Sequence, residues 1–217
     1  MNNVTSIVFS LLVIVIFSLK PDLAWTAETI LLPAPRQDGG QPLMATLKAR
    51  KSTREFAGRS IPLQNLGELL WAGFGVNRPE SGMRTAPSAH NRQEIDIYVA
   101  MQQGLFLYNA EKHLLEPIVD KDIRSQTGKQ RFPGQAPVNL IYVVNFDRMP
   151  QVARPDAIEA AAISTGAIVQ NVYLYCASEG LAAVVRGWID RTVLAQAMGL
   201  GSKQYIIVAQ TVGFPGK

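Results

Sequence analysis

Cysteine and histidine are scarce in this sequence of 217 residues, which contains one Cys and two His. Cys176 has no second cysteine with which to form an intramolecular disulfide. His90 and His113 lie far apart in the sequence, and neither belongs to a Cys/His spacing typical of a metal site. The sequence therefore predicts neither an internal disulfide nor a structural metal ion.

Motifs of several common enzyme classes are also absent. The sequence has no G-x-S-x-G, no P-loop and no set of His, Asp and Ser that would indicate a hydrolase. No G-x-G-x-x-G follows a predicted strand, so a Rossmann dinucleotide site is not expected. Asp and Glu are scattered without a catalytic pair, and we assign no catalytic side chain. If the protein is an enzyme, a bound cofactor is expected to supply the difficult chemistry.

The positive charge is small and local. Of a net charge of +4, much comes from one cluster formed by Lys48, Arg50, Lys51 and Arg54. No nucleic-acid-binding motif accompanies the cluster, so we do not expect a nucleic-acid partner. A small basic cluster also suits a phosphate-bearing ligand. With 47% hydrophobic and 18% charged residues, the composition is that of a globular protein.

The first 27 residues are typical of a targeting segment. Residues 7–19 form an almost wholly apolar run of thirteen, too short to span a bilayer but long enough for the core of a signal peptide. Small residues follow at Ala24, Thr26 and Ala27, whereas residues before the run lack the usual Lys or Arg. We predict a signal peptide over 1–27 and export to the periplasm. A buried core helix and an uncleaved membrane anchor are the alternatives.

The remaining chain, about 190 residues, suits one domain with one core. Residues 28–41, with prolines and glycines, predict an extended linker, and 42–217 form the domain. Helices are expected at 42–51, 62–75, 121–127 and 191–198, strands at 94–101, 105–108, 113–118, 138–146, 182–185 and 204–212, and loops at 77–93 and 132–137. Helices and strands are intermixed, with an antiparallel meander in the middle, which predicts an α+β or a mixed α/β fold and not a uniform βαβ array.

The longest helix is expected from Asp156 to about Glu179. Asp156 and Glu159 form a capping-box pattern at its start, and Gly180 marks its end. The helix is rich in alanine and has Gly166 midway. Small residues allow another helix to approach closely, within the subunit or across a dimer.

Three segments carry groups that suit a planar cofactor with a phosphate. Residues 50–54 (RKSTR) combine three cations and two hydroxyls, which can bind a phosphate dianion, although a solvated basic turn has the same composition. Residues 86–93 offer uncharged donors and acceptors that suit the edge of a flavin ring, and an ordinary surface loop is the alternative. In residues 180–190 an apolar strand ends in an Arg-Gly turn that allows close approach to a planar ligand. Alternatively, Gly187 only makes the turn and Asp190 caps the next helix.

In this order the segments resemble the nitroreductase family, including its SagB-like dehydrogenase branch. RKSTREF (50–56) is similar to the family's R-R/H-S-x-R/K-x-F signature, and PSAHNRQ (87–93) to its P-S-A/S-x-N-x-Q loop. The stretch from Gly166 to Leu181 is similar to its long helix, and residues 209–215 to its closing strand and G-Y-P turn. The resemblance covers about residues 42–217, and four motifs in the correct order make it specific.

The resemblance implies an α+β sandwich, with a mainly antiparallel central sheet flanked by helices, that binds FMN at the interface of a homodimer. It implies hydride transfer from NADH or NADPH through the flavin to an electron-poor small molecule, such as a nitroaromatic or a quinone. Carried over by position, the residues that hold the FMN phosphate and ribityl chain are Arg50, Lys51, Ser52 and Arg54, with Lys217 as a further phosphate ligand. Those that approach the flavin from the partner subunit are Pro87, Ser88, Ala89 and Asn91. Those that lie against the isoalloxazine are Val185, Arg186 and Gly187.

The resemblance leaves the role of Arg186 and the choice of reaction open. If the Arg186 side chain faces the flavin, its positive charge raises the reduction potential. One alternative reaction is a SagB-like flavin dehydrogenation of a peptide heterocycle, although no fused peptide-recognition domain is evident. Another is an FMN-binding electron carrier that does not turn over nicotinamide, which export favours because nicotinamide cofactors are expected to be scarce outside the cytoplasm.

Overall fold

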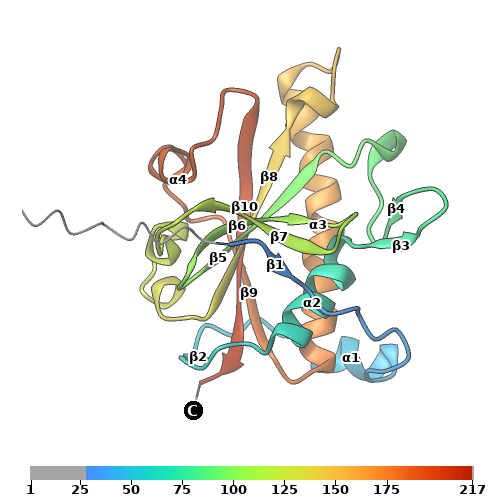
Figure 1. Ribbon diagram of the computed structural model, residues 1–217, viewed down its shortest axis with the longest axis vertical. Helices are drawn as coiled ribbons and strands as arrows, with labels where there is room; N and C mark the ends of the chain where they lie inside the picture. Colours follow the sequence, from blue (N-terminus) through green and yellow to red (C-terminus); the bar gives the residue numbers. More distant parts are fainter. Residues whose placement is uncertain (1–27, 217) are drawn as a thin grey trace, which may run out of the picture.

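One large antiparallel sheet forms the centre of the protein, for which a computed structural model describes residues 28–216 (Figure 1). The predicted signal peptide, 1–27, lies outside the described residues. The strands of the sheet are β1 (Ile30–Leu31), β2 (Phe56–Ala57), β5 (Ile95–Met101), β6 (Gly104–Asn109), β7 (Leu114–Val119), β8 (Val138–Asn145), β9 (Ala182–Arg186) and β10 (Gln204–Pro215). Their order is β1-β7-β6-β5-β8-β10-β2, and β9 pairs with β10 beside this path. Every strand pair in the sheet is antiparallel, as predicted.

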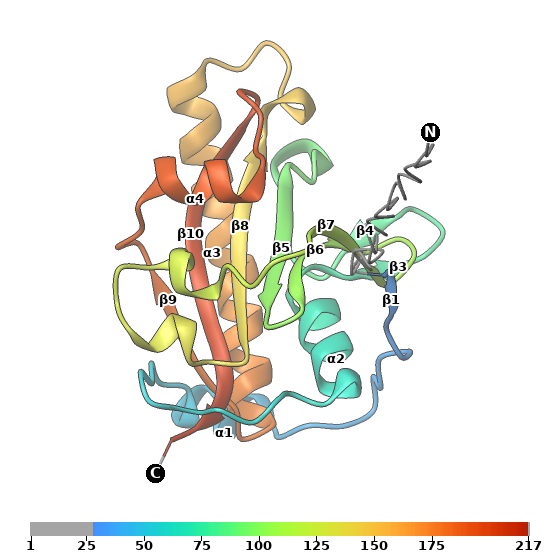
Figure 2. The same cartoon turned by 60° about the vertical axis from the view of Figure 1, so that its left-hand side comes forward.

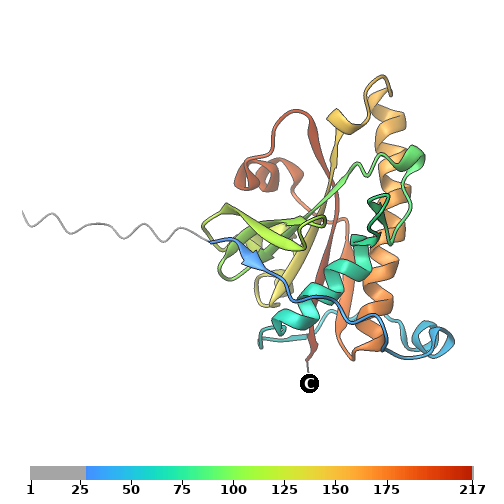
Figure 3. The same ribbon diagram turned by 45° about the vertical axis from the view of Figure 1, so that its right-hand side comes forward.

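Helices cover both faces of the sheet (Figures 2 and 3). The helices are α1 (Leu43–Ala49), α2 (Leu63–Phe74), α3 (Arg154–Ser178) and α4 (Arg191–Met198), with short 3-10 helices η1 (Ala89–Asn91), η2 (Arg124–Thr127), η3 (Phe132–Gly134) and η4 (Phe146–Arg148). The helices α2 and α3 pack on one face, whereas α4 and the η2–η3 segment cover the other. The α+β sandwich that the family resemblance implies is confirmed.

The strand β8 shows why the core has two halves. Its Leu140, Tyr142 and Val144 belong to the hydrophobic cluster under α2 and α3. Its Ile141 and Val143 belong to the cluster under α4. Side chains alternate between the faces of a strand, so only a continuous apolar run can fill both halves. The predicted central strand at 138–146 is therefore confirmed.

The start of α3 differs from the predicted capping box. The helix begins at Arg154, and the residue before it, Ala153, makes no side-chain capping bond. Pro155 occupies the first turn, where its fixed φ favours helix and its missing N–H costs nothing. Asp156 consequently lies inside the first turn, where its charge complements the helix dipole. The other predicted cap is confirmed, because the Asp190 side chain accepts from the Val193 N–H at 3.2 Å.

The loops also contain more structure than the sequence pattern indicated. The expected loop at 77–93 includes a hairpin of β3 (Val76–Arg78) and β4 (Met83–Arg84) together with η1. The short helix expected at 121–127 is a single 3-10 turn, η2. No helix in residues 28–216 is both long and apolar enough to cross a membrane. Within the same residues, no three His, Cys, Asp or Glu side chains are grouped as they would be around a metal ion.

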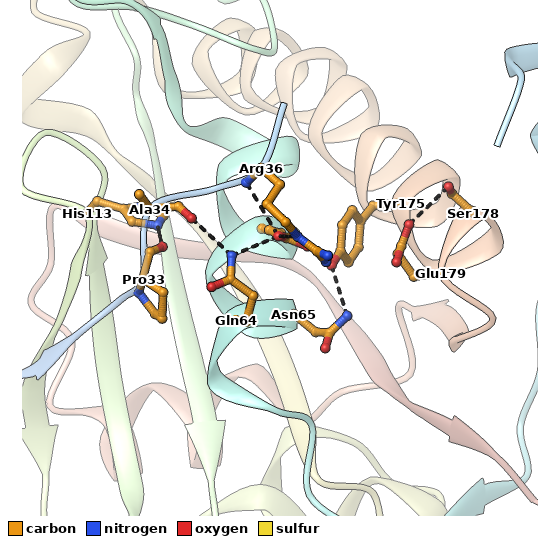
Figure 4. Close-up of polar contacts among 10 residues, drawn as sticks. Pro33, Ala34, Arg36, Gln64, Asn65, His113, Tyr175, Ser178 and Glu179 are labelled. Carbon is orange, nitrogen blue, oxygen red and sulfur yellow. Dashed lines mark hydrogen bonds and ion pairs between the residues drawn. The ribbon is translucent and has the colours of Figure 1, made fainter. Parts of the chain in front are cut away.

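Residues 28–41 are extended, as predicted, but they pack onto the domain and are not a free linker. β1 adds a strand to the edge of the sheet by pairing with β7. The Leu32 N–H donates to the His113 carbonyl at 3.2 Å, and the Gln64 amide donates to the Ala34 carbonyl at 3.0 Å. Figure 4 shows the segment, here called the N-terminal arm, lying across α2.

A buried carboxylate holds the end of the N-terminal arm. Arg36 donates to both oxygens of Glu68 on α2, with its Nε 2.6 Å from Oε1. Tyr175 on α3 donates to the same carboxylate at 2.9 Å, and Gln64 at 2.8 Å. The hydrogen bonds from Arg36 outweigh burial and lower the pKa of Glu68 to about 2. The arm, α2 and α3 are thus joined through one ionised side chain.

Candidate cofactor site

The basic segment that follows α1 is exposed and anchored through its backbone. The Thr53 N–H donates to the Ala183 carbonyl on β9 at 3.0 Å, and Phe56 pairs with Pro215 at the end of β10. Within residues 28–216 none of the segment's three cations, Arg50, Lys51 and Arg54, forms an ion pair. Cations held on a fixed backbone without a counter-ion suit the binding of an anion.

Tyr173 joins this segment to β9. Its hydroxyl lies 2.8 Å from the Ser52 Oγ and accepts from the Val185 N–H at 2.8 Å. The Arg50 guanidinium lies 5.5 Å from the centre of the Tyr173 ring. Either hydroxyl can be the donor in the contact between Ser52 and Tyr173. When Tyr173 donates, the chain runs from the Val185 N–H through Tyr173 to Ser52 and leaves the Ser52 proton free to donate outward.

The sequence pattern alone did not reveal the role of Tyr173. Its ring is buried. The hydroxyl acquires its partners from two segments that are remote in the sequence. The signal that could have found it is a tyrosine among the aliphatic residues of a buried helix face, because a buried hydroxyl requires a partner.

The outer edge of β9 offers an open backbone surface. Val185 is 37% exposed on the face of the sheet that α3 covers. A Cβ added to Gly187 would meet no atom within 4 Å. In an antiparallel edge strand every second N–H points away from the sheet, and the Val185 N–H points outward to Tyr173. Gly187 follows the last residue of β9, Arg186, so by the same alternation its backbone N–H suits a ligand at this edge.

The Arg186 side chain does not face this surface, contrary to the possibility raised by the sequence. Arg186 pairs with Ala209 on β10, whose side chain belongs to the cluster under α4. Its guanidinium donates to the Thr127 carbonyl at 2.7 Å, the Asn139 Oδ1 at 2.9 Å and the Thr211 Oγ1 at 2.9 Å. Side chains of neighbouring strand residues point to opposite faces, so Arg186 lies behind β9. Only its backbone can reach a ligand on the other face.

The loop between β4 and β5 is held in a strained shape. His90, Asn91 and Gln93 all have positive φ angles near 50°, a conformation that costs free energy in residues other than glycine. The Gln93 side chain donates to Asn91 Oδ1 at 3.1 Å and accepts from Arg84 at 2.8 Å. The Ser88 Oγ accepts from the Gln93 N–H at 2.9 Å. The loop is therefore rigidly presented, and its predicted contact residues Pro87, Ala89 and Asn91 are exposed.

The structure brings two of the three predicted segments together. Residues 50–54 meet β9 through the bonds of Thr53 and Tyr173. The loop at 87–93 lies apart, toward the opposite end of α3 (Figures 1 and 3). Beside the basic segment is a cavity of about 210 Å³, lined by Lys51, Thr53 and Tyr173 among others. Ligand pockets commonly measure about 300–1,000 Å³, so one protomer does not enclose a site of the usual size.

Two further cavities do not adjoin the basic segment. One of them, about 640 Å³, lies between the N-terminal arm, α2 and the C-terminal half of α3. Lys217, predicted to bind phosphate, lies outside the described residues. The residue before it, Gly216, donates its N–H to the Glu55 carbonyl at 2.9 Å, which brings the end of β10 beside the basic segment.

Fold and site together define an α+β protein with a basic segment fixed to the edge of an antiparallel sheet. The family model described as the nitroreductase family matches residues 47–214. The chain belongs to the nitroreductase family, and it is an oxidoreductase of that family.

Individual relatives agree with this assignment. A nitroreductase-family protein from Ralstonia eutropha, of known crystal structure, is 46% identical with a TM-score of 0.84, and the match covers 87% of this chain and 90% of the other. A nitroreductase-family protein from Methanocaldococcus jannaschii is 29% identical over 174 residues, which are 76% of this chain and 86% of the relative. A chain of the Escherichia coli microcin synthetase complex, solved with truncated pro-MccB17 bound, shares the fold. Its TM-score is 0.67 at 18% identity, and the match covers 84% of this chain and 77% of the other.

Proposed function

We propose that two copies of this chain bind FMN between them and transfer a hydride from NADH or NADPH to an electron-poor small molecule. The acceptor class is a nitroaromatic, a quinone or a similar compound. Overall, the nicotinamide loses two electrons and one proton, and the acceptor gains these together with one proton from water. FMN, when bound, supplies the redox chemistry by accepting and passing on the hydride.

The observation that carries the proposal is the linkage of Ser52 to Val185 through the Tyr173 hydroxyl. It places a phosphate-type donor set and an open strand edge on one rigid scaffold. A cofactor with an anionic end and a planar ring requires both features at once. The residues present therefore fit FMN.

Each part of the site has a defined role in this proposal. Arg50, Lys51 and Arg54 provide positive charge for the phosphate, and Ser52, which is held by its hydrogen bond with the Tyr173 hydroxyl, provides a neutral donor. Gly187 provides a backbone N–H for the ring edge, and Val185 an apolar contact. Lys217 is proposed as a further phosphate ligand on the basis of the family resemblance alone.

A second copy is proposed to complete the site. The helix α1 exposes Leu43 and Met44, the latter 75% exposed, and buries only Thr46. On α3, Ile163 is 72% exposed, and a Cβ on Gly166 would meet no atom within 4 Å. Apolar helix surfaces of this kind are typical of subunit interfaces. In such a dimer the partner's loop at 87–93 would approach the flavin held by residues 50–54 and β9.

Export to the periplasm is proposed from the apolar run at 7–19 alone. Full-length protein with a reporter at its C-terminus is expected in the periplasmic fraction, with residues 1–27 removed. Contact with a membrane is proposed only through this segment, if it is retained. Mass spectrometry of the purified protein separates cleavage from an uncleaved anchor, and reporter activity confined to the cytoplasm would contradict export.

The visible spectrum of the purified protein tests the cofactor. We expect a yellow protein whose flavin absorbance bleaches when NADH or NADPH is added without oxygen. A colourless protein that cannot be loaded with FMN would contradict the proposal. A yellow protein that neither nucleotide bleaches would favour an electron carrier, or a dehydrogenase that draws its electrons from another substrate such as a peptide heterocycle.

A further inference from the structure

We propose that Arg186 raises the reduction potential of the flavin by placing an uncompensated positive charge directly behind the strand that contacts it. This inference rests on the proposed function, because it assigns Arg186 a role toward FMN. Arg186 does not touch the ligand surface and acts through its electric field.

The guanidinium has no acidic partner. All its hydrogen-bond acceptors are neutral, and they belong to Thr127, Asn139 and Thr211. Within residues 28–216 no carboxylate forms an ion pair with Arg186. Neutral acceptors satisfy the donors but do not cancel the charge. A net positive charge therefore remains at this point of the sheet.

The charge is buried, so water screens it weakly. Arg186 is 4% exposed and lies under the η2–η3 segment, with its guanidinium 5.8 Å from the centre of the Phe132 ring. Burial lowers the pKa of Arg186 to about 10, which leaves the side chain protonated at neutral pH. Buried charges act over longer distances than exposed ones because the surrounding medium is less polarisable.

The position of Arg186 aims this field at the proposed ring site. Val185 and Gly187, its neighbours on either side, present the open edge and face of β9. The two-electron-reduced flavin carries more negative charge than the oxidised flavin, so a nearby cation favours reduction. If the two charges are taken as roughly 10 Å apart in a medium with an effective dielectric constant of about 20, the Coulomb energy favours the reduced state about tenfold.

An adjoining side chain offers a second way to change the charge. Gln130 is half-buried, and its Oε1 is buried without a hydrogen-bond partner among residues 28–216. This oxygen and the Arg186 guanidinium both lie against Gly128, where an added side chain would collide with each of them. Gln130→Glu would therefore place a carboxylate of the same shape beside Arg186 without removing any bond that Arg186 makes.

The experiment is an equilibrium redox titration of the FMN-loaded protein against a reference dye. In Arg186→Gln we expect about tenfold less reduced flavin at a given potential, equivalent to about 30 mV for a two-electron couple. Gln130→Glu is expected to shift the potential in the same direction. Arg186→Lys, which keeps the charge but loses hydrogen bonds, is expected to stay near wild type. Lys129→Gln makes the same charge change at an exposed position and serves as the control.

The outcomes separate this inference from the proposed function. Wild-type protein that binds no FMN overturns the proposed function and this inference with it. FMN-loaded Gln130→Glu and Arg186→Gln with unchanged potentials overturn this inference alone. This inference is also overturned if Arg186→Lys lowers the potential as much as Arg186→Gln does. The loss of hydrogen bonds would then explain the shift in both variants. If Arg186→Gln does not fold, Gln130→Glu decides the question.

Discussion

The Tyr173 hydroxyl lies 2.8 Å from the Ser52 Oγ, although the two residues are 121 positions apart in the sequence. The same hydroxyl accepts from the Val185 N–H. One oxygen on α3 therefore sets the position of the basic segment relative to β9. The residues that bind the phosphate and those that contact the ring must be separated by the length of the cofactor. We therefore expect the Tyr173 hydroxyl to affect the affinity for FMN.

Tyr173→Phe is expected to weaken FMN binding about fivefold. The substitution keeps the ring but removes the bridge, and a hydrogen bond of this kind contributes about 1 kcal/mol. The measurement is a titration of apoprotein with FMN, followed by flavin fluorescence. Tyr175→Phe, on the same helix, removes a hydroxyl that binds Glu68 instead and is the matched control. Equal affinity of the two variants for FMN would contradict the role of Tyr173.

Arg54→Ala is expected to lower the affinity for FMN more than tenfold. A charge-assisted contact to phosphate contributes about 1.5–3 kcal/mol, and Arg54 is exposed with no ion pair within residues 28–216. Isothermal titration calorimetry at two salt concentrations measures the loss of affinity for FMN and the part of that loss that depends on charge. Lys203→Ala, in the turn before β10, removes an exposed cation elsewhere and should leave affinity unchanged. Wild-type affinity in Arg54→Ala would mean that the phosphate binds elsewhere.

Acid is expected to destabilise the protein through Glu68. The folded state lowers the pKa of Glu68 to about 2, chiefly through its hydrogen bonds from Arg36. The stability that comes from this group is therefore complete above the ordinary pKa of about 4.5 and is lost as the pH falls from there toward 2. The free energy of unfolding, measured with denaturant at several pH values, should fall across that window.

The substitution Glu68→Gln should flatten this part of the stability curve. The amide cannot titrate, and it also loses the ionic hydrogen bonds, so the variant should be about 1–3 kcal/mol less stable at neutral pH. Glu80→Gln, in the exposed turn between β3 and β4, is the control. If the stability of Glu68→Gln falls between pH 4.5 and 2 in parallel with that of wild type, other groups cause the loss of stability in acid.

Ile163→Glu is expected to convert a dimer into monomers and to weaken FMN binding at the same time. The side chain is 72% exposed on α3, beside the open surface of Gly166, so a carboxylate there does not disturb the core of one protomer. Light scattering after gel filtration gives the molecular mass of the particle, and the flavin content of the purified protein reports FMN binding. Ile118→Glu, on β7 and 43% exposed, is the control. A variant that is monomeric but retains FMN would mean that one protomer suffices.

Local patterns predicted much of the fold. The apolar run at 138–146 indicated a strand buried on both faces, and β8 is such a strand because each of its faces meets a separate cluster. Asp190 indicated the start of α4, which depends only on a side chain and an N–H three residues away. The capping box at Asp156 failed because Pro155 offered a competing start one residue earlier. The basic segment was also evident, because charge density is a local property.

The sequence by itself therefore determined most of the longer helices and strands and the family motifs, all of which depend on residues near one another in the chain. Only the tertiary structure decided which groups share a site. Side chains alternate along a strand, so Val185 and Arg186 must face opposite sides of the sheet. The pairing of β9 with β10 decides which of the two faces α3. The same pairing buries the charge of Arg186 behind the strand, and the packing of α3 brings Tyr173 to Ser52. Contacts between remote segments depend on register and packing, which no local pattern encodes.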